Sequence, residues 1–272
     1  MYKLIALDLD ETLLGSDHHV PERNRRAIAR AMEQGVYVVP CSGRSFNIMQ
    51  EVLYELGMYQ RKHTYSVTFN GACITENYHN RICALEDGLS WDDCNAIWQY
   101  GCELGTVDVH LYTLNTIWTT PLNAADQEVF DALHIPSVAT TQRSIEFLKG
   151  SHLVKILYMN LSLDYLHTIS KTMPPIASAL DTTFSSDRYL EFNAKGVSKA
   201  SGLTRLAAYL GIDMHDVIAI GDSDNDAEMI RAAGLGVCMA NGGDAYKRMA
   251  NYVTHATNDE GGVAEVIEKF VL

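Results

Sequence analysis

The chain has 272 residues, of which 47% are hydrophobic, and its formal net charge is −13. This length fits one large domain or two smaller ones, and the apolar content argues against a disordered chain. The negative charge argues against a surface for nucleic acid or an anionic membrane, so we expect neither as a partner.

The first third of the chain alternates between strand and helix patterns. Residues 3–10 and 36–45 read as buried strands, residues 21–35 and 46–58 as helices, and residues 65–75 as a strand and turn. Alternation of this kind is typical of a parallel sheet with helical crossovers.

The last third resumes the same pattern. It contains predicted helices at 199–211, 227–234 and 262–272, and predicted strands at 216–226 and 235–241. We therefore expect an α/β protein whose Rossmann-like parallel-sheet core is built from residues 1–84 and 190–272.

The middle of the chain, residues 85–189, has a different sequence pattern. Its segments 107–120 and 152–161 alternate apolar and polar residues, as half-buried antiparallel strands do, and all three tryptophans lie in it. We interpret this stretch as an inserted α/β cap domain.

The six cysteines include no Cys-x-x-Cys pair, and no signal-peptide pattern is apparent. No apolar run approaches the ~20 residues of a membrane span. These features favour a reduced, cytoplasmic protein.

Polar residues follow three of the predicted core strands. Asp8 and Asp10 follow the first, Ser42-Gly43-Arg44 the second, and Gly221-Asp222, with Asn225 and Asp226, the third. In an open parallel sheet, ligands bind outside the carboxyl ends of the strands. Clustered carboxylates must either protonate or hold a cation, and oxygen-only ligands suit Mg²⁺. Two-metal nucleic-acid cleavage also uses carboxylates, but the acidic chain has no evident basic groove.

Four segments together resemble the haloacid dehalogenase superfamily, and most closely its Cof-type phosphatase branch. They are DLDET at 8–12, CSGRS at 41–45, KGVSKASGL at 195–203 and GDSDNDAEMI at 221–230, in the family's order. FNGA at 69–72 and NDEGGVAEVIEKF at 258–270 also resemble that branch. The inserted segment matches the family's large α/β cap in position and size.

The resemblance implies a role for each matching residue. Asp8 would be the nucleophile that forms an aspartyl-phosphate, Asp10 the general acid and base, and Lys199 the partner of Asp8 and the phosphate. The implied phosphate-binding residues are Leu9, Ser42, Gly43, Lys199 and Asn225. Asp8, Asp222 and the backbone carbonyl of Asp10 would bind Mg²⁺, with Thr12 and Asp226 in support.

Some residues near these motifs are ambiguous. Lys195 competes with Lys199 but ranks second, because the family's lysine follows GVS. Arg44 fits either a phosphate ligand or a residue that holds its loop. Two positions depart from the branch, which usually has Gly where this chain has Glu11 and Ala200. The glutamate places a charge beside the site and puts the backbone freedom there in doubt.

We expect a Mg²⁺-dependent phosphatase for small phosphate monoesters, such as sugar phosphates or related metabolites. The alternatives are a sugar phosphomutase with the same motifs, a dehalogenase, and a non-catalytic binding protein. A dehalogenase does not need Asp10, and binding proteins on this fold tend to lose Asp8, Asp10 or Lys199.

The cap is expected to be mobile and to select the substrate, with chain crossings near residues 81–86 and 188–192 as its hinges. The sequence leaves the oligomeric state open between monomer and dimer.

Overall fold

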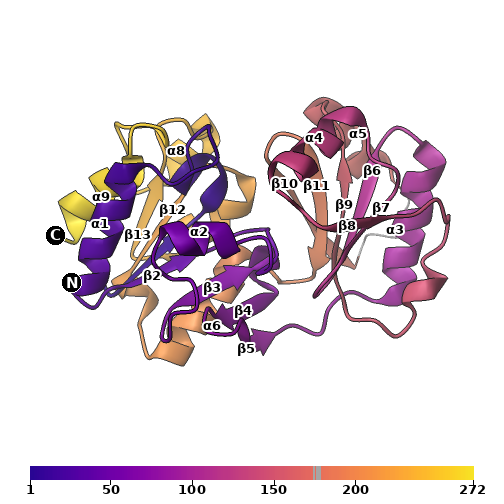
Figure 1. The fold of residues 1–272 in the computed structure, drawn as a ribbon. Helices are drawn as coiled ribbons and strands as arrows, with labels where there is room; N and C mark the ends of the chain where they lie inside the picture. The colour runs from indigo at the N-terminus through magenta and orange to yellow at the C-terminus, as the bar shows by residue number, and fades with distance from the viewer. Residues whose placement is uncertain (174, 176–178) are drawn as a thin grey trace. The chain divides into compact units, whose positions relative to one another are not determined.

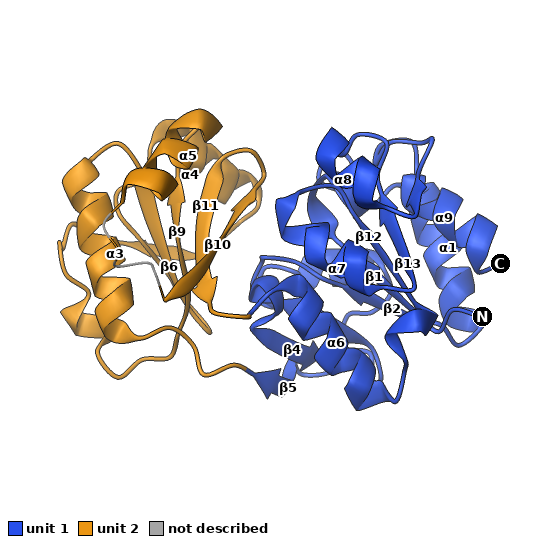
Figure 2. Ribbon diagram, turned by 180° about the vertical axis from the view of Figure 1, so that it is seen from behind, with its two compact units in different colours: residues 1–85, 197–272 blue, residues 86–196 orange. Residues whose placement is uncertain are grey.

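The computed structural model describes residues 1–173, 175 and 179–272. The chain forms two compact units, shown in Figure 2. Unit 1 contains Met1–Leu85 and Val197–Leu272, and unit 2 contains Glu86–Gly196. The predicted boundary and hinge near residues 188–192 are wrong, because strand β11 (Tyr189–Ala194) pairs with β9 (Leu153–Met159) and β10 (Leu180–Ser185) in unit 2. The chain therefore returns to unit 1 after Gly196.

Unit 1 is built on a parallel sheet of five strands in the order β14-β13-β12-β1-β2 (Figure 1). In chain order the strands are β1 (Leu4–Leu7), β2 (Tyr37–Pro40), β12 (Val217–Gly221), β13 (Leu235–Cys238) and β14 (Tyr252–Val253). The first strand is an interior strand of the sheet and pairs with β12 on one side and β2 on the other. This arrangement confirms the predicted α/β fold with a parallel-sheet core.

Side chains of β1 alternate between two buried layers, as the pleat of a strand requires. Ile5 and Leu7 pack in the cluster formed with α1 (Glu22–Glu33), α2 (Gln50–Glu55) and α9 (Gly262–Phe270). Leu4 and Ala6 pack on the opposite face, against residues of α6 (Lys199–Leu210) and α7 (Ala227–Ala232). Burial on both faces explains why the strand reads as a continuous apolar run, and it leaves the strand end as the place for polar groups.

The remaining elements of unit 1 are a small antiparallel sheet and a short helix. The sheet has strands β3 (Tyr65–Thr68), β4 (Cys73–Glu76) and β5 (Arg81–Leu85), and the helix is α8 (Asp244–Met249). Between β3 and β4, Phe69, Asn70 and Gly71 all have positive φ, at 51°, 52° and 99°. A left-handed Phe is rare, so surrounding contacts must hold this turn.

Unit 2 contains a sheet of six strands in the order β10-β11-β9-β6-β7-β8. Its further elements are β6 (Asp108–Thr113), β7 (Ile117–Thr119), β8 (Ser137–Ala139), α3 (Trp91–Leu104), α4 (Ala124–Ala132) and α5 (Leu163–Thr172). The strand pairs are antiparallel except β7 with β8. Trp98 is fully buried in the unit's apolar core, and its Nε1–H donates to the carbonyl of Gln142 at 2.9 Å.

Among the residues that the structure describes, no helix combines the length and the apolar character needed to cross a membrane.

Candidate active site

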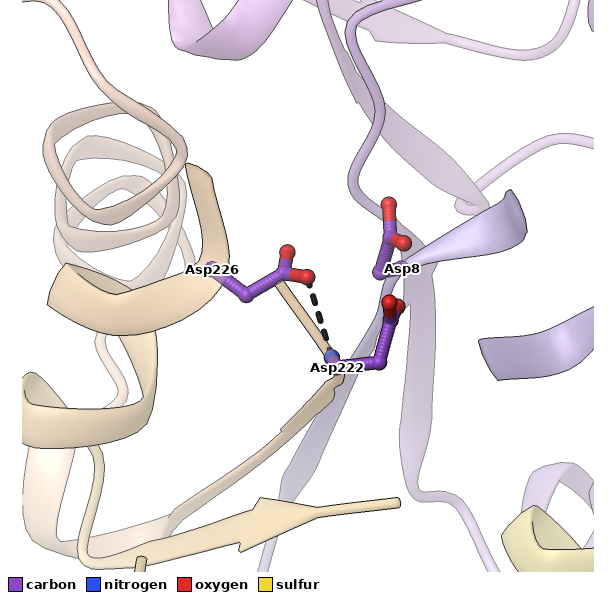
Figure 3. Close-up of side chains that lie close together, drawn as sticks. All are labelled: Asp8, Asp222 and Asp226. Atoms are coloured by element: carbon purple, nitrogen blue, oxygen red, sulfur yellow. Dashed lines mark hydrogen bonds between the residues drawn. The ribbon is translucent and has the colours of Figure 1, made fainter. Parts of the chain in front are cut away.

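Three buried carboxylates meet at the carboxyl ends of the central strands of unit 1. Asp8 follows β1 directly, and Asp222 follows β12, which is its neighbour in the sheet. Asp226 ends a short turn, Asp224–Asp226, just before α7. One carboxylate oxygen from each residue lies within 4.8 Å of those of the other two (Figure 3). The parallel order of β1 and β12 thus brings together aspartates that are more than 200 positions apart in the chain.

Lys199 is the positive group of this cluster. It is the first residue of α6, whose start is fixed by a capping box between Ser198 and Ser201. Its Nζ donates to Oδ1 of Asp8 at 2.5 Å and to Oδ1 of Asp226 at 2.7 Å. Burial alone would lower the pKa of Lys199, but the two carboxylates raise it well above its ordinary value. The lysine is therefore charged at neutral pH.

One lysine does not balance three carboxylates. Burial, and next the charge of Asp226, raises the pKa of Asp8 from its ordinary 3.8 to about 7. The same two causes raise the pKa of Asp222 to about 9, against a hydrogen bond from the Thr12 hydroxyl to Asp222 Oδ1 at 2.7 Å. A bound cation would relieve this excess of negative charge. The donors are all oxygens, so these residues fit a hard ion such as Mg²⁺.

Asp226 also organises the backbone around Asp222. Its Oδ2 accepts the N–H of Asp222 at 3.1 Å, the contact drawn in Figure 3, and the N–H of Ser223 at 3.3 Å. Its other oxygen holds Lys199. Asp226 was predicted to support the site, and its contacts tie β12 to the lysine.

The side chain of Asp10 has a different partner from the other carboxylates. Asp10 lies in a wide turn, Leu9–Leu13, that Leu14 closes by donating its N–H to the carbonyl of Leu9 at 2.9 Å. Arg44 donates to both of its oxygens, with Nε to Oδ2 at 3.2 Å and Nη2 to Oδ1. Reasoning from the sequence missed this pairing; the only signal was that both residues follow neighbouring strands.

The wide turn is fixed from outside by asparagine amides. Glu11 has φ 58° and ψ 8°, a left-handed conformation, and its carbonyl accepts from Asn241 Nδ2 at 2.7 Å. Asn24 and Asn258 donate in the same way to the carbonyls of Leu13, at 3.3 Å, and Leu14, at 2.9 Å. Asn258 begins the segment 258–270 that resembles the family branch, but no role was assigned from the sequence to any of the three asparagines.

The remaining predicted residues lie on neighbouring loops of unit 1. Ser42 is buried after β2, and its Oγ accepts the N–H of Arg44 at 3.1 Å. Asn225 Nδ2 donates to Oδ1 of Asn70 at 3.5 Å, so the left-handed turn touches the loop that carries Asp222. Gly43 lies between Ser42 and Arg44. Lys195 is exposed in unit 2, whereas Lys199 reaches Asp8.

Comparisons with known proteins extend over nearly the whole chain. A family model described as haloacid dehalogenase-like hydrolase matches residues 5–267. The chain is 31% identical over 273 residues to YxeH of Bacillus subtilis, a match that covers 100% of this chain and 99% of YxeH.

A second relative in Bacillus subtilis, 5-amino-6-(5-phospho-D-ribitylamino)uracil phosphatase YcsE, is 32% identical over 272 residues, with 99% of this chain and 96% of YcsE covered. Among solved structures, a haloacid dehalogenase-like hydrolase from Bacteroides thetaiotaomicron is 29% identical, with a TM-score of 0.83 and 99% of each chain covered.

Proposed function

Because the chain belongs to the haloacid dehalogenase-like hydrolase family and is a phosphatase, we propose that it hydrolyses small phosphate monoesters with Mg²⁺, through an aspartyl-phosphate on Asp8. The observation that carries this proposal is the contact between Asp8 and Lys199 beside two further buried carboxylates. A carboxylate held by a charged lysine at the edge of a parallel sheet is well suited to attack a phosphoryl group.

Asp8, Asp222 and the backbone carbonyl of Asp10 would hold the Mg²⁺ ion. When bound, the ion supplies positive charge that lets an ionised Asp8 approach an anionic phosphate. The raised pKa values of Asp8 and Asp222 support this assignment, because burial first and the charge of Asp226 second disfavour the ionised carboxylates, which a bound cation would favour. Thr12 orients Asp222, and Asp226 holds Lys199 in place.

The protein groups carry the reaction in two steps. In the first, Asp8 attacks phosphorus; we assign Oδ2 as the attacking atom because Lys199 holds Oδ1. The P–O bond to the alcohol breaks, and Asp10 gives its proton to the leaving oxygen. In the second, Asp10 takes a proton from water, the water oxygen attacks phosphorus, and the bond to Asp8 breaks, releasing inorganic phosphate.

Phosphate oxygens would be bound by the residues around these two aspartates. The assignment comprises the backbone of Leu9, the hydroxyl of Ser42, the N–H of Gly43, the ammonium of Lys199 and the amide of Asn225. Such donors act on charge that develops during phosphoryl transfer, and they need little rearrangement when they are held in advance. Ser42 is positioned in advance by its hydrogen bond with Arg44 of the same loop, and Asn225 by its hydrogen bond to Asn70 of a neighbouring loop.

For the substrate, we propose a phosphate ester on a short polyhydroxylated carbon chain. The name of YcsE gives a phosphoribityl compound as the substrate of that relative, and a sugar phosphate shares its hydroxylated chain and its ester. We further propose that unit 2 is the cap that selects the substrate, since the carboxylate cluster and Lys199 lie in unit 1.

Six free cysteines support a reducing compartment, and we place the reaction in the cytoplasm.

The test is a phosphate-release screen over sugar phosphates, polyol phosphates and nucleotides. It compares the purified wild type with and without a chelator, and with Mg²⁺ added back, against the variant Asp8→Asn. We expect chelation to abolish turnover reversibly and Asp8→Asn to lower it by several orders of magnitude. Full activity after chelation would contradict the metal assignment. A variant that keeps a tenth of the wild-type rate would contradict the nucleophile.

A further inference from the structure

We propose that Arg44 is a positioning residue for Asp10, which fixes the orientation in which Asp10 meets the leaving group. This inference rests on the proposed function, because it assigns Arg44 a part in the same reaction. The sequence left Arg44 open between a phosphate ligand and a residue that holds its loop. The geometry points to a third role, exerted through the Asp10 carboxylate.

The contact between Arg44 and Asp10 uses two nitrogens of the guanidinium and both oxygens of the carboxylate. A two-point contact between planar groups fixes the plane of the carboxylate as well as its position, which a single donor cannot do. The Arg44 side chain is only 14% exposed, against 37% for Asp10. The arginine is therefore the more enclosed partner, and it holds an aspartate that is accessible from solvent.

The backbone of Arg44 is anchored on both sides of the residue. Its N–H donates to Oγ of Ser42 at 3.1 Å, and its carbonyl accepts the N–H of Phe69 at 3.0 Å. Phe69 and Asn70 are the left-handed residues of the turn after β3, and Asn70 donates its N–H to the carbonyl of Ser42 at 3.0 Å. A strained turn that persists needs surroundings that over-determine it. These bonds link the orientation of Asp10 to Ser42, which we assign to phosphate binding.

The consequence for catalysis follows from the needs of proton transfer. A general acid must lie within hydrogen-bond reach of the atom that it protonates, and a misplacement of about 1 Å can cost roughly 100-fold in rate. Arg44 cannot itself be the acid, because a guanidinium does not lose its proton in proteins. Two ways for Arg44 to affect the rate are the placement of Asp10 and direct contact with the phosphate, and these two routes predict different kinetics.

The experiment measures the first turnover of an alkyl phosphate and of 4-nitrophenyl phosphate. Nitrophenolate leaves with little need for protonation. The rate of its release therefore depends on the other groups of the site and only weakly on the general acid. The variants are Arg44→Met, Arg44→Lys, Asp10→Asn and the double variant Arg44→Met/Asp10→Asn. Arg26→Met is the matched control, because it makes the same chemical change at an exposed arginine that pairs with Glu22. Circular dichroism of each variant checks the fold.

We expect Arg44→Met to slow release of the alkyl alcohol by roughly 10- to 100-fold and nitrophenolate release by less than about threefold. Arg44→Lys keeps the charge but offers one donor nitrogen in place of two. Its rate on the alkyl ester should lie between those of Arg44→Met and wild type. In the Asp10→Asn background, Arg44→Met should cost less than threefold more, since its target is already lost.

Equal losses on the two esters, or a full additional loss in the double variant, would overturn the proposal in favour of direct phosphate binding. If Arg44→Met is unfolded, the decision passes to Arg44→Lys, for which equal losses on both esters count against positioning. Failure of the proposed function is a separate result, in which the wild type releases no phosphate from either ester or Asp8→Asn remains active.

Discussion

Replacing Asp222 by asparagine should stabilise the metal-free protein while removing its response to Mg²⁺. Asp222 is 7% exposed and lies near Asp8 and Asp226, and its pKa of about 9 reflects burial first and the charge of Asp226 second. Asparagine has nearly the same shape, and its amide oxygen can keep the hydrogen bond from Thr12. The substitution therefore removes a charge and its titration but little packing.

The size of the effect follows from proton linkage. In the folded, metal-free protein Asp222 keeps its proton up to about pH 9, whereas in the unfolded chain it loses it near its ordinary value of 3.8. Between these values the folded state binds more protons, so its stability falls as the pH rises. One such proton contributes at most about 1.4 kcal/mol per pH unit. For a chain of this length, that change in the free energy of unfolding shifts the thermal unfolding midpoint by roughly 2–4 °C per pH unit.

Thermal unfolding followed by circular dichroism at pH 6, 7 and 8, with chelator and then with excess Mg²⁺, tests this reasoning. Glu33→Gln, at an exposed position of α1, controls for the loss of one negative charge. With chelator, the midpoint of Asp222→Asn should exceed that of wild type by an amount that grows with pH. With Mg²⁺, the wild type should gain stability and the variant should not. A variant that is less stable than wild type at pH 8 without metal would refute the electrostatic account.

Three further outcomes are expected. Asp10→Asn should slow alkyl esters roughly 10²- to 10⁴-fold and spare the first step of a nitrophenyl ester, whereas Lys199→Ala should slow both similarly; first-turnover kinetics on the two esters distinguishes these profiles. A chimera that carries a relative's unit 2 on this unit 1 should keep its dependence on Asp8 and Mg²⁺ but adopt the donor's substrate ranking, and a ranking that stays with unit 1 would contradict a selective cap. Glu11→Gly should stabilise the chain by about 1 kcal/mol in urea unfolding, because glycine adopts the left-handed conformation without strain; a loss of stability would contradict the expectation that relief of strain is the dominant effect.

The parts of the site that could be predicted from the sequence are those that a strand end determines. An apolar run buried on both faces marks β1 and β12 as central strands, and the residues that follow them, Asp8 and Asp222, then share one edge of the sheet. The choice of Lys199 over Lys195 had no such physical basis. Both are lysines near the start of a helix, and only the resemblance to a family distinguished them.

Contacts that join distant loops were beyond prediction for a physical reason. The pairing of Arg44 with Asp10 depends on side-chain directions at two neighbouring strand ends, and neither residue type specifies a direction. Strand β11 was assigned from the sequence to the wrong unit, because a strand pattern does not show which sheet the strand joins. The choice between sheets depends on pairing with β9 and β10, which local patterns do not encode.

Glu11 shows how such distant contacts let a site tolerate an unfavourable residue. The backbone at Glu11 adopts a conformation that glycine favours, with φ at 58°. A non-glycine residue in this region costs on the order of 1 kcal/mol. The amide of Asn241, which is 230 positions away, holds the Glu11 carbonyl, and Asn24 and Asn258 hold the next part of the turn. Because these three amides fix the turn, Asp10 keeps its backbone position without a glycine beside it.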